Sequence, residues 1–290
     1  MLSAIVNGTE YSLDDGTLCT LVGYEGWGSF PVERLTSEGP MQDGDTDLGF
    51  KVKARTASLA VMFHATELSD MYVLRDQINA LFAPGNSLTL KWALPYGDRM
   101  IDVKPSGNIP MPWVVNDWAA QTLALVFRAA DPSFYDPNQV AMSFGLTGGG
   151  TGWPIPWIIP WTIGTATLDQ RVAVTYTGRH KTYPIIRIIG PITNPKITNE
   201  TTGDVLFFDG ITISAGNYYE IDCRYGYKIV TDSGGTDRTG QLTDASDIDT
   251  FRIETAPIAM GGINSIRVEG SSVNTATQVY MNYYNRFTGI

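Results

Sequence analysis

The chain has 290 residues, of which 43% are hydrophobic and only 17% charged, so it can bury a substantial core. Its formal net charge of −10 argues against stable nucleic-acid binding, because affinity for a phosphate backbone comes largely from Lys and Arg side chains that displace counterions. The length exceeds what one compact core usually holds, and 30 glycines and 16 prolines interrupt long helices, so we expect two mainly β domains.

The first domain is expected over residues 1–140. Residues 2–8 and 17–24 have strand-like composition, and the turn-forming sequence Asp14-Asp15-Gly16 between them favours a hairpin. Alternation of hydrophobic and polar residues returns over residues 50–64, which predicts a longer strand. Further strands are predicted at 87–94, 99–105 and 121–137.

One segment of the first domain has helical periodicity. Residues 67–82 place an apolar stripe on one face, with Ser69 as the expected N-cap and Pro84-Gly85 as the expected stop. The stripe consists of Met71, Leu74, Ile78, Leu81 and Phe82. The first domain is therefore predicted as a β structure with a single helix against it.

Between residues 25 and 48 the strand pattern fades into Gly, Pro, Ser and Asp, and we expect a long loop. Loops of this length in compact domains are usually functional or disordered. The sequence from Asp43 through Asp45 to Asp47 begins like a calcium-binding loop, but Leu48 stands at the position that requires glycine. A solvated acidic turn is the favoured interpretation.

A linker and a second domain follow. Residues 141–164 pass from a glycine-rich to a proline- and tryptophan-rich composition, which suits a linker. Over residues 165–290, short strand patterns recur with turn signals between them, which is typical of an antiparallel β-sandwich. Pro191 and Pro195 remove backbone donors from one of these strands, so we expect it to lie at a sheet edge or at a crossover between sheets, and we favour the edge.

The sequence offers no catalytic constellation, metal site or cofactor motif. The chain has two histidines, His64 and His180, and we expect them to lie in different domains, which disfavours a catalytic triad or a histidine-rich metal site. Cys19 and Cys223 are likewise expected in different domains, as buried thiols without a mutual disulfide. The apolar stretch 153–164 is too short for a bilayer span and contains three prolines, so no membrane helix is expected.

Several tyrosines of the second domain could serve a different purpose. Tyr218, Tyr219, Tyr225 and Tyr227 lie close together in the sequence and could form a platform on which a glycan stacks. The alternative is that alternating tyrosines fill the sandwich core and reach its rim with their hydroxyls. We favour the core over the platform.

Four stretches, in their order along the chain, resemble the distal tail (Dit) proteins of long-tailed bacteriophages. In the first domain they are KVKARTASLAV at 51–61, LRDQINALFAPGNSLTLKW at 74–92 and ALVFRAADPSFYD at 124–136. In the second domain the stretch runs from residue 183 to 222 and begins YPIIRIIGPITNPKITNE. The resemblance touches most of the chain.

The resemblance implies a fold and a role. The first domain would be a β-sandwich or barrel related to tail-tube proteins, and the second a galectin-like antiparallel β-sandwich. Such proteins are structural and not enzymes. They form a homo-hexameric ring in the virion, at the tail tip or baseplate, after assembly in the host cytoplasm. Their implied partners are the tail tube protein, a tail-tip protein and the tape-measure protein, with a host glycan or a receptor-binding protein as further partners.

Within this framework, the loop at 25–48 would reach a neighbouring subunit of the ring. Trp27 and Phe30 are its candidate anchors, because aromatic residues concentrate at interface centres, and Asp43, Asp45 and Asp47 would accompany them. The alternative is a loop that folds back on its own domain. Two other functions stay open: a carbohydrate-binding module that uses the tyrosines of the second domain, and a tail-tube subunit.

Overall fold

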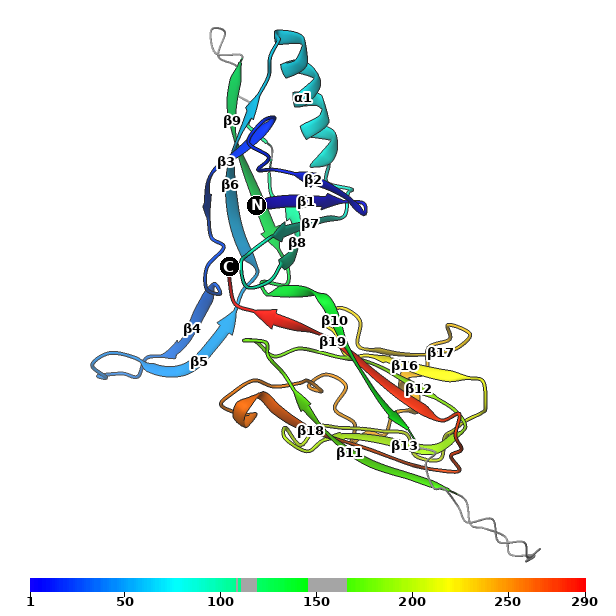
Figure 1. Cartoon of the computed structure of the whole chain (residues 1–290). Coiled ribbons are helices and arrows are strands. Elements are labelled where there is room, and N and C mark those ends of the chain that lie inside the picture. Colours follow the sequence, from blue (N-terminus) through cyan, green and yellow to red (C-terminus); the bar gives the residue numbers. More distant parts are fainter. Residues whose placement is uncertain (108, 111–118, 146–165) are drawn as a thin grey trace, which may run out of the picture. The chain divides into compact units, whose positions relative to one another are not determined.

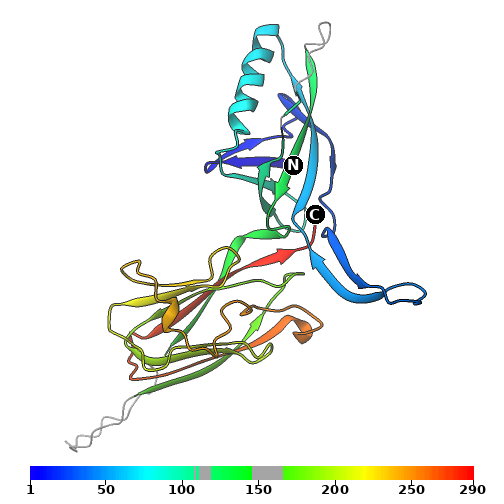
Figure 2. The same ribbon diagram turned by 180° about the vertical axis from the view of Figure 1, so that it is seen from behind.

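A computed structural model describes residues 1–107, 109–110, 119–145 and 166–290 of the chain (Figures 1 and 2). It separates into two compact units, the first formed by Met1–Pro137 with Arg286–Ile290 and the second by Asn138–Asn285. The last five residues of the chain therefore belong to the first unit, although the sequence analysis assigned them to the second. Of the expected linker, residues 141–145 end a strand, and 146–164 lie outside the described residues.

The described residues of the first unit form antiparallel strands and one helix. Its elements are β1 (Leu2–Val6), β2 (Thr9–Ser12), β3 (Cys19–Glu25), β4 (Val32–Ser37), β5 (Thr46–Val52), β6 (Arg55–His64), α1 (Leu68–Leu81), β7 (Leu88–Trp92), β8 (Arg99–Pro105), β9 (Ala120–Ala129) and the start of β10 (Phe134–Gly145). The strands form two runs, β8-β7-β1-β2 and β3-β6-β9-β8. Alternate residues of β6 and β9 are buried in the hydrophobic core of this unit, among them Leu59, Val61, Leu123 and Phe127.

The first hairpin differs from the prediction. β1 pairs with β2 and β7, whereas β3 pairs with β6, so the expected hairpin between residues 2–8 and 17–24 is wrong. The turn lies instead at Asn7-Gly8, where both residues have positive φ angles of 49° and 86°. An Asn-Gly pair is the strongest short signal for a two-residue hairpin, because these residues tolerate that backbone region best.

The single helix occurs where the sequence predicts it. Met71 and Ile78 are buried on its inner face, and the helix ends at Leu81, before Pro84-Gly85. The predicted N-cap at Ser69 is wrong: the N-cap is Glu67, and Ser69 lies inside the first turn. The side chain of the N-cap residue Glu67 makes no capping hydrogen bond. Instead, the hydroxyl of Thr66 donates to the carboxylate of Asp70 across the start of the helix.

The prediction of a long loop over residues 25–48 is also wrong in part. Residues 32–37 and 46–52 form β4 and β5, which pair with each other as a separate two-stranded sheet. Among the described strands, β4 and β5 pair only with each other.

The second unit is an antiparallel β-sandwich, which confirms the predicted mainly β class. Its strands are the end of β10, β11 (Thr167–Thr175), β12 (Ile185–Ile189), β13 (Ile192–Asn199), β14 (Val205–Phe207), β15 (Thr212–Ile213), β16 (Tyr218–Asp222), β17 (Ile229–Asp232), β18 (Ile263–Ser271) and β19 (Gln278–Phe287), with short 3-10 turns η1 (Thr239–Gln241) and η2 (Met260–Gly262). One sheet runs β17-β16-β12-β19-β10 and the other β11-β18-β13-β14. Their inner faces enclose a second hydrophobic core.

Of the two expected places for the proline-containing strand, the sheet edge is wrong, whereas Pro191 does lie at a crossover, where the chain passes from β12 in one sheet to β13 in the other. Pro195 belongs to β13, which pairs with β18 on one side and with β14 and β15 on the other. The register between β13 and β18 shifts from Thr193 to Lys196, and Asn194 has a positive φ of 51°. This β-bulge takes Pro195 out of the ladder, so a central strand tolerates a residue without an N–H.

Both cysteines are buried and free, and each unit contains one, as expected. Burial raises the pKa of the Cys223 thiol to about 12, so it remains protonated at neutral pH. The two histidines also lie in different units. Among the described residues, no helix is long and apolar enough to cross a membrane.

Arg55 is the most unusual residue of the first core, with only 1% of its surface exposed. Its guanidinium donates hydrogen bonds to four backbone carbonyls: those of Gly26 (2.6 Å), Gly28 (3.0 Å), Pro132 (3.1 Å) and Thr288 (2.7 Å). It also lies over the Phe134 ring, 5.3 Å from the ring centre. One side chain therefore joins three segments that are far apart in the sequence.

Replacing Arg55 should destabilise the first unit. In Arg55→Met the apolar volume is retained, but four carbonyls lose their donor, so we expect the free energy of unfolding to fall by about 3 kcal/mol. Arg55→Lys should have an intermediate effect, because one ammonium group cannot reproduce the fork of donors. Urea unfolding followed by tryptophan fluorescence measures the change.

The control is Arg34→Met, because Arg34 has 65% of its side chain exposed and should change stability by no more than about 0.5 kcal/mol. If Arg55→Met is as stable as this control, the carbonyl contacts do not hold the unit together.

Candidate functional site

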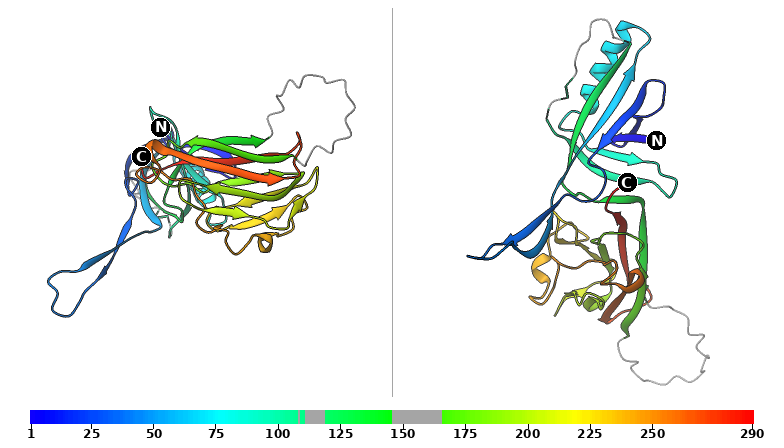
Figure 3. Two further views of the ribbon diagram at one scale, coloured as in Figure 1. Left: turned by 90° about the horizontal axis from the view of Figure 1, so that it is seen from below. Right: turned by 90° about the vertical axis from the view of Figure 1, so that its left-hand side faces the viewer.

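The β4–β5 hairpin extends from the first unit with little support from it (Figure 3). Every residue of β4 is exposed, and most of β5 is exposed as well. The strands pair from Val32–Val52 to Ser37–Thr46, with a register shift between Leu35 and Thr36. An isolated two-stranded hairpin is only marginally stable in water, so this one gains little from its own contacts.

The hairpin exposes large apolar side chains. Val32, Leu35, Leu48 and Phe50 have 50%, 46%, 64% and 61% of their surface exposed, and Met41 at the turn is fully exposed. Arg34 and Phe50 are cross-strand partners on one face, and Leu35, the next residue of β4, points to the other face. Apolar residues gathered on both faces of a projecting element are typical of a surface that another polypeptide covers.

The base of the hairpin is held by buried contacts, in contrast to its exposed strands. Trp27 is 1% exposed, and its ring centre lies 4.7 Å from that of Trp92 and 6.3 Å from that of Phe134. The Trp27 indole N–H donates to the carbonyl of Ser58 at 2.9 Å. Arg55 holds the carbonyls of Gly26 and Gly28 on either side of Trp27. The chain therefore enters β4 from a fixed position.

The predicted interface residues fall into different environments. Trp27 lies in the core of its own unit, and Phe30 is half-buried near the base of the hairpin. Asp43 and Asp45 are exposed in the turn that joins β4 to β5. Asp47 forms an ion pair with Arg34 at 3.0 Å, and it also accepts the backbone N–H of Gly49.

Side chains suited to metal binding are scattered in this region. In the described parts of the chain, no three His, Cys, Asp or Glu side chains lie close enough to hold a metal ion. The acidic residues of the hairpin therefore contribute charge and turn geometry.

The four tyrosines of the second unit do not share one environment. Tyr219 packs against Phe208 with ring centres 5.7 Å apart, and its hydroxyl donates to the side-chain oxygen of Gln241 at 2.8 Å. Tyr218, its neighbour on β16, lies under the guanidinium of Arg187. Because successive residues of a strand point to opposite faces, these two rings cannot form one flat platform.

The other two tyrosines lie together in the turn between β16 and β17. Tyr225 and Tyr227 have 66% and 62% of their surface exposed. The Lys228 ammonium lies 5.0 Å from the Tyr225 ring centre, and the Arg224 guanidinium 4.6 Å from that of Tyr227. Cation–π contacts of this kind fix the orientation of exposed rings.

Comparisons with known proteins identify the fold. No protein-family model matches the chain, and no curated protein matches it in sequence. Its structure resembles the crystal structure of the Dit (gp 19.1) protein of SPP1, described as a paradigm of the hub adsorption apparatus in Gram-positive-infecting phages. The TM-score is 0.67 and the identity 13%, over 99% of both chains.

Two structures of the phage P2 baseplate in its activated conformation also match over 98% of both chains. The form with Ca has a TM-score of 0.53 at 10% identity, and the form with Sr has 0.52 at 9%. The chain therefore has the Dit fold along nearly its whole length, which confirms the sequence resemblance at the level of fold. The galectin-like description of the second unit stays a prediction.

The exposed hairpin predicts a difference in hydrogen exchange. In a dilute solution, where the chain is dissociated, the amides of β4 and β5 should exchange much faster than those of β6 and β9. The reason is that few buried contacts oppose local opening of the β4–β5 hairpin. The amides of β4 and β5 should become protected at concentrations where the chain associates with itself. Exchange measured by mass spectrometry over a concentration series gives the result; equal protection of β4 and β6 in the dissociated chain would contradict it.

Proposed function

We propose that the chain is a structural protein of a long phage tail. It forms a hexameric ring at the distal end of the tail, joins the tail tube to the tail tip or baseplate, and leaves a channel for the tape-measure protein and DNA. The observation that carries the proposal is the Dit fold shared over both units with a phage adsorption hub and with phage baseplate chains. The ring, the channel and the individual partners go beyond the shared fold and are part of the proposal.

The hairpin supports the ring. A closed cyclic assembly with more than two subunits requires a heterologous contact, in which one surface of a subunit meets a different surface of the next. The β4–β5 hairpin is suited to the first of these surfaces, because its apolar side chains on both faces are exposed within its own unit. Trp27 then acts inside its own unit as the anchor of the arm, and Leu35, Leu48 and Phe50 make the contact.

The surface of one sheet supports the channel. The face of β6 and β9 that points away from the core carries small uncharged side chains, with Ala60 opposite Ala124 and Ser58 opposite Val126. Its basic groups lie at the ends: Arg128 with its cross-strand partner Lys104 of β8 at one end, and His64 at the other. A face with so few basic groups suits a passage through which DNA moves without being bound, because retention requires several phosphate contacts.

The second unit supplies a further surface, for which a carbohydrate-binding function is the second candidate. Tyr225 and Tyr227 are exposed and held by neighbouring cations, which favours recognition of a host glycan or of a receptor-binding protein by the turn between β16 and β17. The proposal assigns the chain no catalytic activity, and its place is the virion.

Charges on the hairpin should disrupt the ring. The double variant Leu35→Asp with Phe50→Asp puts one carboxylate on each face of the hairpin, so each subunit contact should weaken by about 3 kcal/mol, or about a hundredfold. Light scattering after size-exclusion chromatography should then show the mass change from a hexamer to a single chain. The far-UV circular dichroism should stay unchanged, because the hairpin contributes nothing to either core.

The matched control is Ile258→Asp, which adds a charge at a residue of the second unit with 54% of its surface exposed, and it should remain hexameric. A wild-type chain that stays monomeric at high concentration would contradict the ring, as would a double variant that assembles like the wild type.

A further inference from the structure

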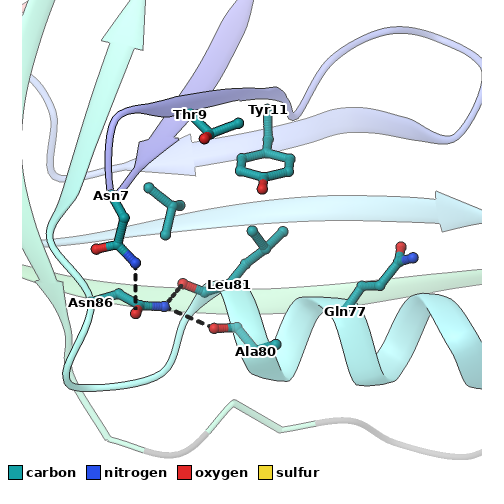
Figure 4. A pocket seen from close by; sticks show the side chains of 8 residues that line it. Asn7, Thr9, Tyr11, Gln77, Ala80, Leu81 and Asn86 are labelled. Atoms are coloured by element: carbon teal, nitrogen blue, oxygen red, sulfur yellow. Dashed lines mark hydrogen bonds between the residues drawn. The ribbon is translucent and has the colours of Figure 1, made fainter.

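A groove lies on the first unit between the tip of the β1–β2 hairpin and the end of α1 (Figure 4). It has a volume of about 590 Å³ and is lined by Val6, Asn7, Thr9, Tyr11, Gln77, Ala80, Leu81 and Asn86. None of these side chains is charged. Its volume is in the range of about 300–1,000 Å³ that is typical of binding pockets.

One end of the groove is closed by hydrogen bonds. The side-chain amide of Asn7 donates to the side-chain oxygen of Asn86 at 3.0 Å. Asn86 in turn donates to the carbonyls of Ala80 (2.8 Å) and Leu81 (3.0 Å) at the end of α1 (Figure 4). The wall formed by the helix is thereby fixed against the wall formed by the hairpin.

The other wall of the groove is an edge strand. β2 pairs with β1 alone among the described strands and ends the run β8-β7-β1-β2, and all four of its residues are exposed. Thr9 and Tyr11, two residues apart, point toward α1 (Figure 4). An extended segment that hydrogen-bonds to the free edge of β2 would direct alternate side chains toward Gln77 and Ala80 of the helix. Addition of a strand to an exposed edge, with pockets for alternate side chains, is a common mode of peptide recognition.

The β4–β5 hairpin has the properties that such a groove requires. β4 and β5 each keep one edge without a described partner strand, and Leu48, Gly49 and Phe50 form an uncharged stretch with two exposed apolar side chains. Exposed Lys51 follows this stretch and is opposite in charge to exposed Asp76, which precedes Gln77 at the groove, and to Glu10 of β2. Asp47 before the stretch, in contrast, is paired with Arg34 of its own hairpin. Within the first unit, the hairpin extends on one side and β2 with α1 lies on the other (Figures 1 and 3).

From these observations we propose that the groove between β2 and α1 receives the β4–β5 hairpin of a second copy of the chain. This inference rests on the proposed ring and identifies the second half of its subunit contact. The β5 segment 48–50 adds to the edge of β2, and Leu48 or Phe50 enters the groove. Because the hairpin and the groove lie on opposite sides of one unit, each copy gives its hairpin to one neighbour and receives the hairpin of the other, as ring closure demands.

Cysteine cross-linking in the full chain tests this contact. Leu48→Cys is combined in turn with Thr9→Cys, Gln77→Cys and Ala80→Cys, and the protein is oxidised under native conditions. A disulfide forms only where two Cα atoms approach within about 7 Å, so the result reports contact and not mere association. The native Cys19 and Cys223 are buried and give little background. We expect at least one pair to produce a ladder of covalent multimers, which neither single variant produces.

The matched control pairs Leu48→Cys with Tyr24→Cys. Tyr24 has 59% of its surface exposed and lies on β3, an edge strand of the other run, which pairs only with β6 in the described residues. A ladder from the Tyr24 pair alone would assign the contact to β3 and overturn the inference. Absence of a ladder from all groove pairs, in a protein that light scattering shows to be hexameric, would overturn it as well and leave the ring intact.

A monomeric wild-type protein, in contrast, would remove the proposed ring, and this inference with it. A second variant gives a functional measurement: Ala80→Trp fills the groove from the helix side and should cause loss of the hexamer. Tyr72→Trp, on an exposed position of the same helix outside the groove, should keep it. Equal assembly of the two variants would contradict the proposal.

Discussion

The first unit depends on Arg55, a buried cation to which the described residues offer backbone carbonyls and no carboxylate. Burial lowers the pKa of Arg55, but a guanidinium remains charged in proteins, so its positive charge must be neutralised by dipoles. Four backbone carbonyls supply them, from the segment before β4, the turn before β10 and the end of the chain. Only the planar fork of an Arg side chain reaches all of these acceptors at once. This requirement explains why residues 286–290 return to the first unit after the chain has formed the second.

The same contact separates a rigid base from an exposed arm. Arg55 and Trp27 fix the backbone just before β4, while the strands that follow bury almost nothing of their own. A hairpin so exposed would cost conformational entropy to order and would recover little of it within one chain. Held by a fixed base and bound to a neighbouring copy in the proposed ring, it would recover that cost through the burial of its apolar side chains. The physical features of the arm thus agree with the proposed role in assembly.

Part of this structure could be predicted from the sequence, and the reasons for the failures are specific. β6, β9 and α1 were found because each buries one face, so their hydrophobic periods are visible. β4 and β5 were missed because all or most of their residues are exposed, and strands without a buried face leave no alternation to detect. Pro195 indicated an edge, but a bulge of one residue removes it from a central ladder. Trp27 was predicted as an interface anchor because aromatic residues concentrate at interface centres, and the sequence could not reveal that its ring packs beside Trp92 in the core of its own unit. The role of Arg55 was hidden because its partners are carbonyl groups, which every residue carries.

The central claim is that identical copies join through the projecting hairpin into a ring with an open centre. Electron microscopy of the purified wild-type chain tests it most directly, because two-dimensional class averages report both the symmetry and the opening. The account predicts sixfold-symmetric rings with an open centre. Averages that show a single two-lobed molecule, or a closed particle without a central opening, would contradict it.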